Sequence, residues 1–176
     1  MIIAETPRLI LRHFTARDID TLIPILGDPE VMRYSIDGVK TKSQTAHFLE
    51  RILDYYRQYH FSLYALIEKE TQQLIGFCGL LPWKWQGKKE IELGYRLAKK
   101  YWGKGLATEA ATAVIAHAWQ KLALPQIFCI IEPENQRSIR VARKLGMIYL
   151  TKDVFYDLQV NIYCLSNPDY SRTEIF

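Results

Sequence analysis

A glycine-rich turn between a strand pattern and a long helix pattern constrains the fold of this chain more than any other feature. Residues 91–97 alternate as a half-buried strand does, with one apolar and one polar face, formed by Ile91, Leu93, Tyr95 and Leu97 and by Glu92, Gly94 and Arg96. Gly103 and Gly105 follow, and apolar residues then recur at helical spacing from Gly103 to about Leu122. Because glycine adopts backbone conformations that other residues avoid, the pair predicts a tight turn from strand into helix.

The rest of the pattern predicts further strands and helices around this unit. Strands are expected at residues 8–13, 61–68, 74–81, 127–131, 149–156 and 158–165, and helices at residues 17–26, from 41 onward and from 135 to 146. Thr41 and Gln44 have the spacing of a capping box. Polar residues 69–73 and 86–89 predict turns between strands. We expect a single domain over residues 1–176, of the α/β (or α+β) class, with a mixed central sheet flanked by helices.

Length and composition exclude several classes of protein. A chain of 176 residues with 49% hydrophobic and 24% charged residues is typical of a folded globular domain. Its net charge of +4 is too small to indicate a nucleic-acid partner. No apolar run approaches membrane-spanning length, and residues 1–12 carry charges too early for a secretory signal. We therefore expect a cytoplasmic protein without membrane or nucleic-acid partners.

The cysteines and histidines do not form a recognisable metal or redox motif. Cys78, Cys129 and Cys164 are odd in number, widely spaced and set in apolar runs, which is typical of buried reduced thiols. The four histidines, His13, His47, His60 and His117, fall in different segments without metal-ligand spacing. The sequence therefore predicts no metal.

The turn around Gly103 and Gly105 also has the makings of an anion site. A helix N-terminus presents unpaired N–H groups and a favourable dipole, and Lys100 and Lys104 add positive charge. The segment is not a Walker A loop, and Thr108 stands where a dinucleotide-binding motif has its third glycine. From the residues alone, a phosphate cradle and a merely tight turn remain equal alternatives.

Three motifs nevertheless resemble those of one family. Lys100, Gly103 and Gly105 occupy the positions of the Arg/Gln-x-x-Gly-x-Gly/Ala signature of the GNAT superfamily of N-acetyltransferases, with Lys as a departure at the first position. The segments IELGYRL, YWGKGLATEA and ENQRSIRVARKLGM, and the opening TPRLILRHFTARD, resemble the subgroup that contains the ribosomal-protein N-terminal acetyltransferases. The resemblance extends from about Thr6 to Tyr156.

The resemblance implies acetyl-CoA as acyl donor and a sheet that splays between strands 91–97 and 127–131. Backbone groups of Tyr95, Arg96 and Leu97 would then pair with the pantetheine arm. The amides of the turn and the first helical residues would hold the pyrophosphate beside Lys100, and these are Trp102, Gly103, Lys104, Gly105, Leu106 and Ala107. Asn135 would contact the pantetheine through its side-chain amide, a role that is compatible with capping a helix.

The same resemblance implies direct transfer to an amine, so no enzyme nucleophile is needed. Glu92 is the candidate general base; its alternatives are a solvated carboxylate or a partner for Arg96. The tyrosine that protonates the leaving thiolate in many GNAT enzymes is replaced here by Ala142. Ser138, one turn earlier on that helix, is the candidate in its place, and a purely local role in the first turn remains equally open.

Two hypotheses of function follow. The first is acetyl transfer from acetyl-CoA to a primary amine, either a protein N-terminus or a small amine such as a polyamine, amino acid or drug. The second is an acyl-CoA-binding or sensing module without catalysis. Residues 29–39 and 81–89 are the candidate acceptor loops, and Asp28, Glu30 and Asp37 would favour a cationic amine. Trp83 and Trp85 line the acceptor site, form an exposed aromatic loop or belong to the core edge. A homodimer stays open by analogy alone.

Overall fold

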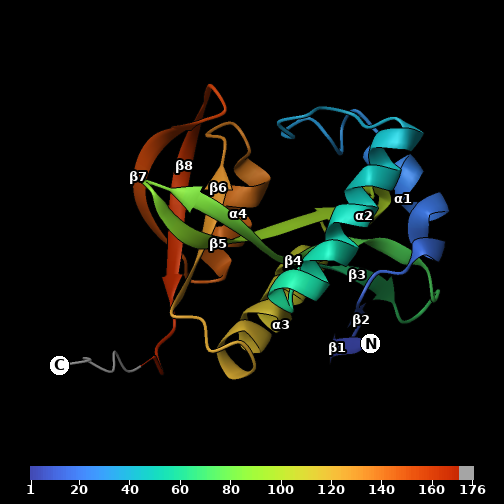
Figure 1. Ribbon diagram of the computed structural model, residues 1–176, viewed down its shortest axis with the longest axis horizontal. Coiled ribbons are helices and arrows are strands. Elements are labelled where there is room, and N and C mark those ends of the chain that lie inside the picture. Colours follow the sequence, from blue (N-terminus) through green and yellow to red (C-terminus); the bar gives the residue numbers. More distant parts are fainter. Residues whose placement is uncertain (171–176) are drawn as a thin grey trace.

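An eight-stranded mixed sheet organises the chain in the computed structural model, which describes residues 1–170 (Figure 1). Its strands lie in the order β1-β2-β3-β4-β5-β6-β8-β7. Every neighbouring pair is antiparallel except β5 and β6, which are parallel. The strands are β1 (Ile2–Glu5), β2 (Leu9–Arg12), β3 (Leu63–Glu68), β4 (Leu74–Trp85), β5 (Lys88–Leu97), β6 (Gln126–Ile131), β7 (Ile148–Phe155) and β8 (Leu158–Ser166).

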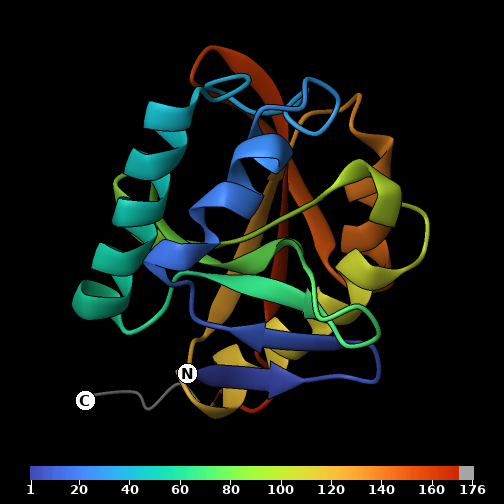
Figure 2. The same ribbon diagram turned by 90° about the vertical axis from the view of Figure 1, so that its right-hand side faces the viewer.

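Helices cover both faces of this sheet (Figures 1 and 2). A short 3-10 turn, η1 (Ala16–Asp18), leads into α1 (Ile19–Leu26), and a loop connects it to α2 (Lys42–Tyr59). These two helices pack on one face around Leu22, Leu49 and Phe77. A second turn, η2 (Lys99–Tyr101), precedes α3 (Leu106–Gln120), and α4 (Gln136–Lys144) follows β6. Residues of α3 and α4 pack on the opposite face, in a larger core.

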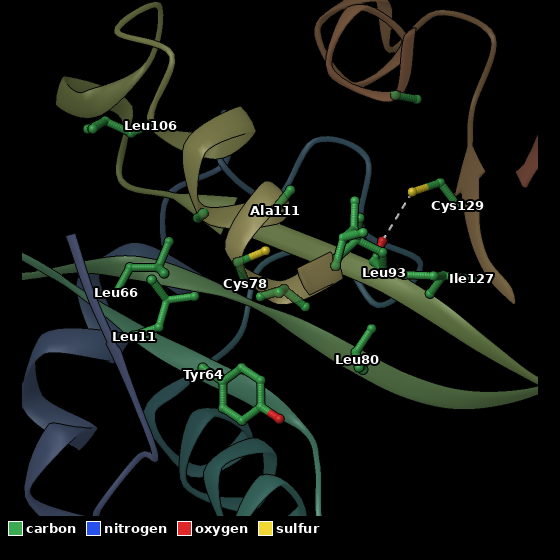
Figure 3. Close-up of a cluster of buried hydrophobic side chains, with 14 of the residues drawn as sticks. Leu11, Tyr64, Leu66, Cys78, Leu80, Leu93, Leu106, Ala111, Ile127 and Cys129 are labelled. Atoms are coloured by element: carbon green, nitrogen blue, oxygen red, sulfur yellow. Dashed lines mark hydrogen bonds between the residues drawn. The ribbon is translucent and has the colours of Figure 1, made fainter. Parts of the chain in front are cut away.

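The sheet opens between its two halves. The parallel strands β5 and β6 are in register at one position, Glu92 opposite Phe128, whereas β4 and β5 pair over ten positions. Beyond that position the strands part, and the thiol of Cys129 donates a weak hydrogen bond to the Leu93 carbonyl at 3.4 Å (Figure 3). The predicted mixed sheet, splayed between these two strands and flanked by helices, is confirmed.

Three local predictions, namely a capping box, a hairpin turn and buried cysteines, are also confirmed. Thr41 and Gln44 form the expected capping box at the start of α2, because each side chain accepts a hydrogen bond from the other's backbone N–H. The turn at 69–73 joins β3 and β4 as a hairpin. All three cysteines are free and buried. Among the described residues, no helix is long and apolar enough to cross a bilayer.

Two predicted boundaries were wrong and one strand was missed. The long helix begins at Leu106 rather than Gly103, since Gly103 and Gly105 both have left-handed backbone angles that a helix does not accept. Residues 81–89 are mostly paired strand instead of an open loop, because β4 continues to Trp85 and β5 starts at Lys88. Strand β1 lies at the sheet edge and is too short to show a clear alternation.

Tyr56 links α2 to the strands beneath it. Its hydroxyl donates to the Leu63 carbonyl and accepts from the Phe14 amide at 3.2 Å. Replacing Tyr56 with Phe leaves both backbone groups without this partner, so we expect the free energy of unfolding to fall by about 1–3 kcal/mol. Urea denaturation measures the change. Tyr55→Phe, on the same helix, is the control, and equal effects of the two substitutions would contradict this role of the hydroxyl.

Candidate functional site

The turn between η2 and α3 presents a row of unpaired backbone amides. Gly103 and Gly105 adopt φ of 76° and 78°, which turns the chain sharply before the helix. Within the described residues, no hydrogen bond uses the amides of residues 103 to 107. The amide of Trp102 differs, because it donates to the Lys99 carbonyl at 3.1 Å. The free donors at the start of a 15-residue helix form a cradle for an anion such as a pyrophosphate.

A charged contact from the first strands fixes this cradle. The Arg8 guanidinium pairs with Glu109 at 2.6 Å and donates to the Lys104 carbonyl at 2.9 Å. Glu109 also accepts from the Thr6 hydroxyl and from the Arg8 amide. Burial opposes ionisation of Glu109, but these hydrogen bonds outweigh it and lower the pKa of its carboxyl. No sequence pattern predicted this contact, since its partners lie about 100 residues apart.

The cradle is also tied to β5 and to α4 through Trp102. The indole N–H of Trp102 donates to the Leu97 carbonyl at 2.8 Å, and the Arg137 guanidinium lies 4.4 Å from the ring centroid. Lys100 and Lys104 both lie over the ring of Tyr101, at the edge of the same turn. Arg137 is exposed in the first turn of α4 and adds a third positive charge beside the free amides. Sequence reasoning missed it, although it stands within the quoted motif around Asn135.

Glu92 stands at the last position where β5 and β6 are paired. Its neighbours directly across the strands are Leu81 on β4 and Phe128 on β6, so its carboxylate emerges from an apolar surface. The described residues offer this carboxylate no hydrogen bond and no ion pair. Burial therefore raises the pKa of Glu92 to about 7, although the positive charge of Arg96 opposes the rise. A carboxylate poised near neutral pH suits proton transfer.

Tyr95, Ser138 and Asn135 meet on the other side of the opening. The Tyr95 hydroxyl crosses from β5 to α4 and donates to the Ser138 carbonyl at 3.3 Å. Asn135 caps α4 by accepting from the Ser138 amide at 3.2 Å. The Ser138 hydroxyl has no hydrogen bond to a described residue, whereas Ala142 is fully buried in the core. The structure thus brings the predicted residues of α4 next to β5 across the opening.

The loop between α1 and α2, residues 27–41, spans this opening from above (Figure 2). Met32 contacts the Arg96 guanidinium on β5, and the Tyr34 hydroxyl donates to the Glu134 carbonyl just before α4 at 3.2 Å. Glu30 forms an ion pair with Lys99 in η2. The loop therefore touches both sides of the gap and roofs the face that carries Glu92.

Trp83 and Trp85 belong to an aromatic cluster rather than an exposed loop. Their rings stack at 6.0 Å, and both meet Phe128 edge-on, at 6.4 and 5.5 Å. Trp83 also packs against Phe155, and the Trp85 indole N–H donates to Asp153 at 2.6 Å. Because Phe128 lies beside Glu92, this cluster forms one wall of the site. One surface hollow lies along β7 and β8, and a second is lined by Trp85, Glu90 and Phe128 together with residues of β7 and β8; neither includes Glu92 or the cradle.

The histidines lie apart from this site. His13 stacks on Tyr56 at 3.9 Å, His117 meets Tyr64 edge-on, and His47 is exposed on α2. His60 ends α2 in a left-handed conformation. Among residues 1–170, no three His, Cys, Asp or Glu side chains converge as metal ligands would.

Gly105 gives a direct test of the cradle. A side chain there would be strained at φ 78°, and its Cβ would approach the Arg8 guanidinium at 3.6 Å. We expect Gly105→Val to weaken binding of coenzyme A at least tenfold by calorimetric titration, because the branched side chain covers the free amides. Gly87→Val is the matched control, since Gly87 has φ 79° in a hairpin turn with open space around it. Retained affinity in Gly105→Val would place the anion elsewhere.

Comparison with known proteins finds one family. The family model of the acetyltransferase (GNAT) domain matches residues 8–148. An N-acetyltransferase named p20, of uncharacterized function, from Bacillus licheniformis is 35% identical over 142 residues, covering 80% of this chain and 79% of the relative. A GNAT-family acetyltransferase from Bacillus anthracis superimposes with a TM-score of 0.80 at 26% identity, over 95% of this chain and 99% of that chain.

A second solved structure is that of RimL, a ribosomal L7/L12 alpha-N-protein acetyltransferase in complex with coenzyme A. It is similar with a TM-score of 0.80 over 94% of this chain and 98% of that chain. Because the identity is 17%, this likeness shows the fold alone.

Proposed function

This chain belongs to the GNAT acetyltransferase family, and we propose that it transfers the acetyl group of acetyl-CoA directly to a primary amine. The acceptor is either a small amine or a protein N-terminus. The family and its relatives are N-acetyltransferases, and acetyl-CoA is the acyl donor that they use. One observation carries the proposal: the Glu92 carboxylate, with a pKa of about 7 and no hydrogen bond or ion pair to a described residue, stands where the sheet opens. A sensing module without catalysis would have no need of such a group.

The donor would lie on the α3 and α4 side of the opening. The free amides of residues 103–107 and the charges of Lys100, Lys104 and Arg137 would hold its pyrophosphate. Beyond Glu92, β5 has no paired strand on its β6 side among the described residues. The Leu97 carbonyl already accepts from the Trp102 indole, so the other backbone groups of residues 95–97 that face this side would bind the pantetheine arm. The side chain of Asn135 stands beside that path at the start of α4.

In the transfer itself, the amine nitrogen attacks the thioester carbonyl carbon. The C–N bond forms, the C–S bond breaks, and the amine gives up a proton. Glu92 accepts that proton, directly or through one water, and this requires its ionised form. Strand amides left unpaired at the opening stabilise the developing charge on the carbonyl oxygen. The departing thiolate takes a proton from its surroundings, and the Ser138 hydroxyl is the proposed donor.

A release assay for free thiol, run with acetyl-CoA and a panel of N-terminal peptides and small amines, tests the activity itself. Turnover with at least one amine is the expected result. Tight binding of coenzyme A together with no turnover over the whole panel would instead favour the sensing module.

Glu92 predicts a specific pH dependence. The base works only when ionised, so kcat rises as the pH increases through about 7 and levels off above it. Glu92→Gln should lower kcat about 100-fold and remove this ascending limb, with little change in affinity for coenzyme A. Glu90→Gln is the control on the same strand face, where Glu90 accepts from Gln126 at 3.2 Å. An unchanged rate and profile in Glu92→Gln would remove Glu92 from the mechanism.

Ser138 predicts a smaller effect on the same step. Removal of a single hydrogen bond to the departing sulfur is expected to lower kcat about three- to tenfold in Ser138→Ala, while KM for acetyl-CoA stays unchanged. Ser43→Ala, in the first turn of α2, controls for loss of a hydroxyl at a helix start. If kcat is unaffected, the hydroxyl has only a local role in the first turn of α4.

A further inference from the structure

The face of β5 that carries Glu92 continues as a strip of three residues, Glu92, Gly94 and Arg96. Alternate residues of a strand share a face, and Arg96 is directly opposite Phe77 of β4, which lies in the core beneath α1 and α2. Leu93 and Leu97 point the other way, into the core with α3 and α4. The strip therefore lies on the opposite side of the sheet from the anion cradle, under the roof formed by residues 27–41.

Arg96 is a half-buried guanidinium, and the acid whose charge acts on it is Glu92, on the same strip. Among the described residues its one hydrogen-bond acceptor is the Met32 thioether, at 2.8 Å, and it forms no ion pair. A thioether is a weak acceptor, so most of the five N–H donors of Arg96 stay unused. Desolvation lowers the pKa of Arg96, and a guanidinium withdrawn from water is stabilised most by an anion.

The acidic residues of the overlying loop are already engaged. Glu30 pairs with Lys99, and Asp37 pairs with Lys40 at 3.0 Å. Asp28 accepts from the Glu30 amide at 2.8 Å and shapes the loop backbone. The negative charge that the sequence suggested for a cationic acceptor is thus neutralised or used locally. The charge left over beside Glu92 is positive.

We propose that Arg96 binds a carboxylate of the acceptor, so that this enzyme acetylates amines that also carry an acid in preference to polyamines. The inference rests on the proposed N-acetyl transfer at Glu92 and names the acceptor class for that site. The planar guanidinium matches a carboxylate through two parallel N–H donors, while Glu92 faces the amine. Gly94 places no side chain between them, and a Cβ there would be in ordinary van der Waals contact with the Leu63 side chain, at 3.7 Å.

The spacing of the strip sets the length of the acceptor. The Cα atoms of Glu92 and Arg96 are four residue steps apart along the strand, or about 13 Å. Because both side chains are long, their charged ends can approach one another more closely than that. An α-amino acid, whose amine and carboxylate share one carbon, is short for such a gap. An ω-amino acid of several carbons fits better, as does a peptide whose second residue is acidic. Both offer the same chemistry, a carboxylate at a distance from a primary amine.

The experiment is a comparison of matched acceptors by thiol release. Glycine, β-alanine, 4-aminobutyrate and 6-aminohexanoate are each compared with the alkylamine of equal carbon number, and spermidine is included. Dipeptide amides with Glu or Gln as second residue form the peptide arm. We expect kcat/KM to favour the acid over its matched amine by at least tenfold at one of the longer spacings. The arm with the larger ratio identifies an ω-amino acid or a peptide as the source of the carboxylate.

Variants of the strip connect that preference to Arg96. Arg96→Gln should reduce the acid-to-amine ratio at least tenfold through a higher acceptor KM, with KM for acetyl-CoA unchanged. Arg96→Lys keeps the positive charge but lacks the two parallel N–H donors of the guanidinium, so its acid-to-amine ratio should lie between those of Arg96→Gln and the unsubstituted protein. Met32→Leu removes the thioether contact at similar volume, and Arg57→Gln removes an exposed arginine of α2; both should keep the ratio. Melting temperatures identify any variant that fails to fold.

Three outcomes would overturn the inference. These are alkylamines or spermidine turned over as fast as the acids, an unchanged ratio in well-folded Arg96→Gln, and an Arg96→Gln effect confined to KM for acetyl-CoA. Turnover of no amine at all is a different failure, because it contradicts the proposed function and not the choice of acceptor.

Discussion

The parting of β5 from β6 after a single paired position is the constraint on which the site depends. Had the two strands continued in register, their backbone groups would have satisfied one another, and neither a donor arm nor an acceptor could enter between them. The gap persists because other contacts hold each strand on its far side. β5 pairs with β4 over ten positions, and β6 pairs with β8 over six. Each half of the sheet therefore has its own strand pairing, and the opening lies between the two halves.

Contacts distant in sequence then hold the two halves in place around the gap. Arg8 and Glu109 fasten the first strands to the cradle, and Arg137 reaches from α4 to Trp102. On the other face the loop of residues 27–41 contacts β5 through Met32 and the start of α4 through Tyr34. The contacts of Arg137, Met32 and Tyr34 join elements on the two sides of the opening. They hold its width where the described strands β5 and β6 are paired at one position only.

The sequence predicted the parts of this arrangement that local patterns determine. Alternation located the strand that carries Glu92, and the spacing of Thr41 and Gln44 located the start of α2, because both are set by neighbouring residues. The predicted start of α3 was wrong, because helical periodicity does not show at which residue the turn with left-handed glycines ends and the helix begins. Boundaries of this kind depend on backbone angles that the residue pattern leaves open.

Charge pairs between residues distant in sequence could not be predicted for a different reason. Acidic residues in the loop after α1 suggested a negative acceptor site, yet Glu30 meets its partner, Lys99, only in the folded chain. That Arg96 forms no ion pair with a described residue follows only from the folded structure, in which the loop acids contact other groups. The pKa of Glu92 likewise depends on which side chains surround it, and its strand alone does not reveal them.

The surroundings of Glu92 also couple its chemistry to the stability of the C-terminal half. Phe128 lies beside the carboxylate and packs with Trp83, Val160 and Ile162, so the wall that keeps water from Glu92 is also the core joining the β4–β5 hairpin to β6 and β8. Loosening of that core would admit water and return the pKa of Glu92 toward its usual value near 4.5. Glu92 would then be a weaker base, although more of it would be ionised at neutral pH. Tight packing of the aromatic cluster therefore sets the proton affinity of the residue at the opening of the sheet.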